Sequence, residues 1–106
     1  MDIGSIKVKA LKIRSELKKQ GIHTDVVILF GSQANGTATS ESDTDLAIVS
    51  RDFGKDRLSE GAILNLVASK IDASIELIPI SFDKYFDPEC IYPIVHEIKN
   101  TGIVLF

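Results

Sequence analysis

Hydrophobic residues recur along the chain at two spacings, which predict alternating helices and strands. Apolar residues three or four positions apart predict a first helix over residues 3–20 and a second over residues 58–70. A last helix is predicted over residues 87–100, with Pro93 in its first turn, where a missing N–H costs little. The positions that define these three helices are Ile6, Ala10, Ile13 and Leu17; Leu58, Ala62, Leu66, Val67 and Ile71; and Ile94, Val95 and Ile98.

Short apolar runs rich in β-branched residues predict buried strands over residues 25–30, 46–49 and 74–80, and residues 103–106 predict a short final strand. Pro79 cannot donate to a sheet ladder, so it places the third strand at a sheet edge or marks that strand's end. This order predicts an α/β (α+β) fold, in which helices cover one face of a small mixed sheet. We expect residues 1–106 to form a single domain.

The composition is typical of a globular protein and disfavours disulfide-rich, membrane-spanning and nucleic-acid-binding proteins. With 44% apolar and 25% charged residues the chain has an ordinary globular composition, and its net charge of −3 disfavours direct binding of nucleic acid through backbone phosphates. The single cysteine, Cys90, excludes an internal disulfide and a Cys-rich zinc site and fits a cytoplasmic location. No apolar run approaches the roughly 20 residues of a membrane helix, and the N-terminus does not read as a signal peptide.

Two carboxylates stand one residue apart where the second strand begins. Asp43 and Asp45 point to the same side of an extended chain, because side chains alternate along a strand. Like charges this close repel each other unless a cation lies between them. Mg²⁺ prefers oxygen ligands and is commonly held by one or two carboxylates plus substrate phosphates, so this pair predicts a magnesium site.

A third carboxylate, Glu76, interrupts the apolar third strand, and its side chain must face opposite to those of its two neighbours. If the second and third strands are adjacent, Glu76 completes the three-acid cluster that a two-metal phosphoryl-transfer site needs. Asp72 is a rival third acid, although it lies just before the strand, in the turn. Two simpler roles stay open: Asp43 as a turn residue and Glu76 as a solvent-facing strand residue.

Gly31 and Ser32 directly follow the first strand. Glycine allows a sharp turn and a close backbone approach to a ligand, while serine can bond a phosphate oxygen or cap a short helix through "SQAN". A plain turn is the alternative.

Together, "LFGSQANG" and "SDTDLAIV" resemble the signature of the nucleotidyltransferase superfamily that includes DNA polymerase β: Gly-Ser, a spacer, then Asp-x-Asp. The resemblance covers nearly the whole chain. The short length is similar to that of the minimal nucleotidyltransferases of bacteria and archaea, including the MntA-like antitoxins. It implies a polymerase β palm-like nucleotidyltransferase fold.

The resemblance also implies a role for each motif residue. Gly31 and Ser32 would hold the β- and γ-phosphates of a nucleoside triphosphate, and Asp43 and Asp45 would bind Mg²⁺ in a two-metal site. Glu76 would be the third metal ligand or the base that activates the acceptor hydroxyl. In the nucleotide-binding loop, Asn35 stands where many minimal members have arginine; it keeps a hydrogen-bond donor but loses the charge.

The function implied is transfer of AMP from ATP to a hydroxyl on a partner HEPN-domain toxin, with the chain acting as antitoxin. The domain is too small to offer an obvious pocket for a second substrate, which favours a protein partner or a homo-oligomer. Two alternatives remain: a catalytically weak antitoxin that acts by docking, and a small-molecule nucleotidyltransferase. An aromatic cluster after the third strand, Phe82, Tyr85 and Phe86, fits core packing, purine stacking or partner docking.

Overall fold

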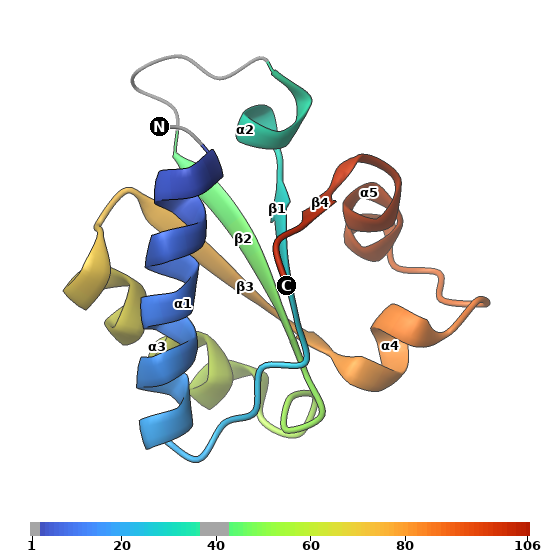
Figure 1. Cartoon of the computed structure of the whole chain (residues 1–106). Helices are drawn as coiled ribbons and strands as arrows, with labels where there is room; N and C mark the ends of the chain where they lie inside the picture. The colour runs from blue at the N-terminus through green and yellow to red at the C-terminus, as the bar shows by residue number, and fades with distance from the viewer. Residues whose placement is uncertain (1–2, 37–42) are drawn as a thin grey trace.

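A four-stranded mixed sheet carries helices on both of its faces (Figure 1). The computed structural model describes residues 3–36 and 43–106, without the side chains of Ser32 and Asn35. In chain order the elements are α1 (Ile3–Lys19), β1 (Val26–Phe30), α2 (Ser32–Asn35), β2 (Thr44–Ser50), α3 (Arg57–Ile71), β3 (Ile75–Ser81), α4 (Phe82–Phe86), α5 (Pro93–Thr101) and β4 (Ile103–Val104). Within these ranges no helix combines the length and the apolar character needed to cross a membrane.

The strands lie in the order β3-β2-β1-β4. β1 pairs antiparallel with β2 and with β4, whereas β2 and β3 run parallel. The condition set for Glu76, that the second and third strands are neighbours, is therefore met. β3 lies at a sheet edge, which is one of the two positions that Pro79 indicated. Beyond β4, the N–H of Leu105 donates to Val27 O and the N–H of Val27 donates to Phe106 O, both at 2.8 Å.

The first face of the sheet is covered by α1 and α3 (Figure 1). All four apolar positions predicted for α1, namely Ile6, Ala10, Ile13 and Leu17, are buried against it. The helix ends where Gly21 adopts φ +78°, and the N–H of Ile22 donates to Leu17 O at 3.0 Å. Only a residue that accepts positive φ without strain fits this stop, and glycine does so.

The buried stripe of α3 differs from the predicted one. Of the predicted positions Val67 is buried and Ile71 is partly buried, but Leu58 and Leu66 are 88% and 65% exposed. Glu60, Leu64 and Ala68 are buried although they were not predicted to be. The side of α3 that carries Leu64, Val67 and Ala68 packs into the core beside α1 and the sheet, so Leu58 and Leu66 face solvent. The helix itself begins after Asp56, whose side chain accepts from Ser59 N.

Burial of the Glu60 carboxylate has a local cause. It accepts hydrogen bonds from the backbone N–H groups of Gly54, Lys55 and Asp56 at 2.9–3.1 Å. Desolvation alone would raise the pKa of Glu60, but these three donors outweigh it and leave the pKa lowered.

The prediction that helices cover only one face is wrong. A second buried cluster lies on the opposite face, where Val95 and Ile98 of α5 pack against strand residues that include Ile28 and Val49. Because both faces are covered, the strands carry continuous apolar runs, and the two faces cannot be told apart by alternation of polar and apolar residues.

The last helix also starts later than predicted. α5 begins at Pro93 rather than at residue 87, because the residue before a proline is pushed out of helical conformation, as Tyr92 is at φ −73° and ψ 121°. Ile94, predicted to be buried, is 36% exposed, and the short helix α4 was not predicted.

Asp72, the alternative to Glu76 as third acid of the site, instead links α3 to α1 and to the start of β3. It caps α3, its carboxylate accepts from Ser74 N at 2.9 Å and Ser74 Oγ at 2.7 Å, and it forms an ion pair with Lys9 of α1. The Lys9 hydrogen bond, followed by those from Ser74, lowers the pKa of Asp72 from 3.8 to about 2.

We predict that Asp72→Asn lowers the free energy of unfolding by about 1–2 kcal/mol at pH 7. A depressed folded-state pKa stabilises the fold above the unfolded value and loses that effect as the pH falls from about 4 to 2. Urea denaturation across this range should therefore show the two proteins converging at low pH. A difference that stays constant with pH would contradict the assignment.

Candidate functional site

Three acids predicted from the sequence lie where β2 and β3 begin, and we call Asp43, Asp45 and Glu76 the acidic edge. Asp45 lies opposite Phe30, the last residue of β1, and level with Glu76 of β3. Asp45 is half-buried, whereas Asp43 and Glu76 are exposed. Asp45 alternates with the first-face residue Leu46, and Glu76 with its buried neighbours, so both carboxylates face the side that carries α5.

The backbone of Gly31 lies in contact with the Asp45 carboxylate of the acidic edge. Its φ is +74°, a conformation that side-chain-bearing residues rarely adopt. A Cβ added there would collide with Oδ2 of Asp45, so the carboxylate lies directly against the Gly31 backbone. Two independent constraints, backbone conformation and space, therefore require glycine where β1 turns into α2.

The Asp45 carboxyl lies within hydrogen-bonding reach of the Glu76 carboxyl. Burial raises the pKa of Asp45, and the charge of Glu76, its hydrogen bond and the charges of Asp43 and Glu97 raise it further. Two carboxylates this close repel each other unless a cation lies between them. The charges that most strongly affect Asp45 are thus all negative, which is the environment that a cation would relieve.

The donor set at the acidic edge fits a hard divalent cation, because it consists of carboxylate oxygens. Within residues 3–36 and 43–106, however, no three His, Cys, Asp or Glu side chains stand close enough to hold a metal ion. The part of the edge already assembled is the pair Asp45 and Glu76, with Asp43 two residues before Asp45. The predicted phosphate contacts of the Ser32 and Asn35 side chains lie outside what the structure describes.

Asp72, by contrast, does not join the acidic edge, because Lys9 and Ser74 already bind its carboxylate. The structure instead adds Glu97, an exposed α5 residue whose charge contributes to the raised pKa of Asp45. Sequence reasoning missed Glu97. No motif marks it, and only the packing of α5 on the second face of the sheet brings it near.

Comparison with known families agrees with this geometry. The sequence model of the family described as polymerase beta, nucleotidyltransferase matches residues 11–106, so the chain belongs to that family. The mixed sheet with its helices is consistent with the polymerase β-like nucleotidyltransferase fold, as predicted. Comparison with the curated proteins gives no match.

We predict that Gly31→Ala lowers the free energy of unfolding by about 1–2 kcal/mol and displaces the Asp45 carboxylate. Replacing Asp45 by alanine first should remove the steric part of this effect and leave only the backbone part. A double-mutant cycle in urea denaturation measures the coupling between the two positions. Strict additivity would show that Gly31 and Asp45 do not compete for space.

We also predict that Asp45→Asn stabilises the metal-free protein at pH 7. A folded-state pKa raised above the unfolded value makes the ionised carboxylate unfavourable for folding at neutral pH, and the penalty fades as the pH falls through the folded pKa. Denaturation at pH 7 and at about pH 3.5 should show the advantage shrinking. The exposed control Asp83→Asn should show no such advantage, and an Asp45→Asn variant less stable than wild type at pH 7 would refute this account.

Proposed function

We propose that this member of the polymerase beta nucleotidyltransferase family transfers a nucleoside monophosphate, AMP from ATP, to a hydroxyl group. The observation that carries the proposal is the Asp45 carboxylate, placed against the Gly31 backbone and beside Glu76. The turn that would bind phosphate and the two acids that would bind a cation thus lie within one short stretch of the sheet.

In the proposed reaction the acceptor hydroxyl oxygen attacks the α-phosphorus of the triphosphate. The bond from the α-phosphorus to the bridging oxygen breaks, pyrophosphate leaves, and the hydroxyl proton passes to a carboxylate of the acidic edge, for which Glu76 is our candidate. Mg²⁺, when bound by Asp43 and Asp45, would neutralise the triphosphate charge and lower the pKa of the attacking hydroxyl; Glu76 would join as a third ligand only if another group takes the proton. Gly31, Ser32 and Asn35 would position the phosphates.

We further propose that the acceptor hydroxyl lies on a partner protein, a HEPN-domain toxin that this chain inactivates as an antitoxin. An exposed apolar patch supports a partner. It consists of Phe82 and Phe86 of α4, whose ring centroids lie 4.5 Å apart, and of Ile91 and Tyr92 in the segment that follows; the four residues are 37–85% exposed. Exposed aromatic and aliphatic residues gathered in one part of the fold commonly mark a protein interface. A free, buried Cys90 fits the reducing cytoplasm in which such a pair would act.

Docking without transfer is the second candidate function. It is favoured by the lack of a three-ligand metal group among the described residues and by the loss of the arginine charge at Asn35. In that case the same apolar patch would carry the neutralising contact and the acidic edge would be dispensable.

We predict that Asp43→Asn with Asp45→Asn lowers transfer at least about a thousandfold while the fold survives, because binding of the catalytic cation is lost. The measurement is the intact mass of the protein encoded beside this chain's gene, co-expressed with wild type or variant. Glu16→Gln with Asp52→Asn is the matched control, since it removes two acids that belong neither to the acidic edge nor to the segment of the apolar patch.

The outcomes separate the candidates. A gain of one AMP mass with wild type and the control, but not with the double variant, supports transfer. A tightly bound but unmodified partner supports docking, and a gain of another nucleotide's mass corrects the choice of ATP. Modification that proceeds at the wild-type rate with the double variant would overturn the mechanism.

A further inference from the structure

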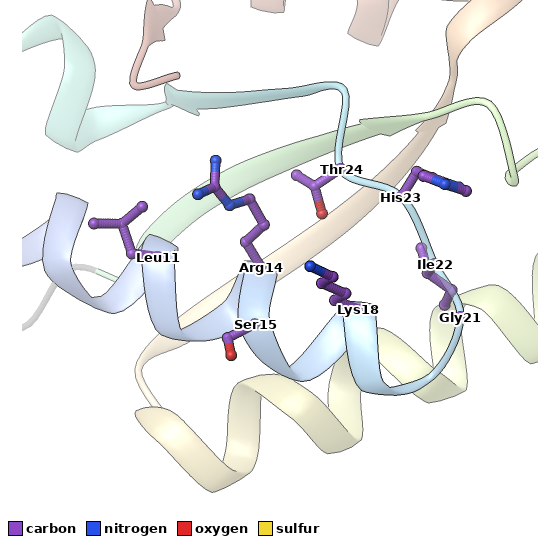
Figure 2. A pocket seen from close by; sticks show the side chains of 8 residues that line it. All are labelled: Leu11, Arg14, Ser15, Lys18, Gly21, Ile22, His23 and Thr24. Carbon is purple, nitrogen blue, oxygen red and sulfur yellow. The ribbon is translucent and has the colours of Figure 1, made fainter.

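A pocket lies at the opposite end of β1 from the acidic edge, where α1 ends and the chain turns toward the sheet (Figure 2). Its volume is about 560 Å³, within the range of small-molecule sites. We call it the α1–β1 pocket. Its lining comes from one continuous segment: Leu11, Arg14, Ser15, Lys18, Gly21, Ile22, His23 and Thr24.

The lining is basic. It includes no acidic residue, and Figure 2 shows the side chains of Arg14 and Lys18 extending from α1 toward the segment that carries Thr24. Neither cation has an ion-pair partner within the described ranges, whereas Lys9 and Lys19 of the same helix each pair with a carboxylate. Two neighbouring cations are therefore left without a counter-charge beside one hollow.

The Arg14 side chain is held by packing rather than by a charge. Its guanidinium lies 4.8 Å from the centroid of the Phe106 ring, a cation–π contact that orients the group. Such stacking uses the face of the guanidinium and leaves its N–H edge available for an oxygen ligand.

An unpaired hydroxyl on Thr24 is a separate observation that points to a ligand. Its Oγ1 is shielded from water and has no hydrogen-bond partner among the described atoms. Buried hydroxyl groups nearly always have a partner, because leaving one unpaired is unfavourable. In Figure 2 this hydroxyl points toward the side of the pocket where Lys18 lies.

His23 lies at the rim and points away from these groups (Figure 2). Its backbone N and its ring Nδ1 each lie 2.8 Å from Oδ2 of Asp52. This carboxylate is thus engaged with His23, and it does not line the pocket where it would neutralise Arg14 and Lys18.

We propose that the α1–β1 pocket binds a small phosphate-bearing anion. Arg14 and Lys18 supply charge-assisted hydrogen bonds, and Leu11 and Ile22 offer an apolar wall to the rest of the ligand. The Thr24 hydroxyl supplies a further donor once the groups that shield it from water move aside for the anion. A discrete anion suits this site better than a nucleic-acid backbone, because the chain carries a net charge of −3 and only two unpaired cations line the pocket. The pocket needs no metal ion and is separate from the acidic edge.

The test is titration of the ¹⁵N-labelled whole chain with pyrophosphate, followed by NMR in the presence of EDTA so that no divalent cation bridges the ligand to the acidic edge. Amide shifts should concentrate between Lys18 and Thr24. Arg14→Gln with Lys18→Gln should weaken binding about tenfold or more. The matched control Lys12→Gln with Lys19→Gln makes the same charge change on the same helix, away from the pocket, and should stay within about twofold.

Thr24→Val separates binding from folding. Since the hydroxyl makes no hydrogen bond to any atom that the structure describes, this variant should keep the thermal stability of wild type while binding pyrophosphate more weakly. Equal weakening by the pocket variant and the control, or shifts spread over the surface, would overturn the proposal. So would a Thr24→Val variant that loses stability but binds pyrophosphate as wild type does.

Discussion

The site depends on the fit of one carboxylate between two strands. Asp45 must lie against a backbone that has no side chain at Gly31, and it must stand level with Glu76 across a parallel pair. Both contacts fix the same register, because a shift of one residue along β2 would turn Asp45 to the opposite face. The antiparallel β1–β2 pair and the parallel β2–β3 pair are therefore tied to the acidic edge through a single side chain.

The two hydrophobic clusters explain why this carboxylate can be held in place. β2 is buried along its length except at Asp45, which is half-buried, so the strand offers few ways to move. α1 and α3 hold it from one side and α5 from the other, and α5 brings Glu97 toward the same carboxylate. Burial and the nearby negative charges make the ionised form of Asp45 unfavourable in the free protein. A cation bound beside Asp45 would relieve this penalty.

The spacing of apolar residues predicted those helices and strands whose burial follows from their own sequence. The α1 stripe, the three main strands and the opposition of Glu76 to its two neighbours follow from spacing and parity, whereas the placement of Asp45 beside Glu76 needed the strand order of the structure. Sequence failed where the deciding contact was distant or competed with propensity. Leu58 and Leu66 looked like core residues, yet α3 packs through the side that carries Leu64, Val67 and Ala68. The second covered face was hidden because strands buried on both sides show no alternation, so the approach of Glu97 had no readable signal.

The pairing of the chain's last residues with β1 has a consequence for the order of folding. β1 gains β2 soon after it is made, but its other edge is completed only by β4 and by the bonds between Val27 and residues 105 and 106. Until that segment arrives, an apolar strand presents unpaired N–H and C=O groups, the kind of edge that invites association between chains. Because β4 spans only two residues, the same edge is where the native sheet would open first, and each opening would briefly restore the unprotected strand.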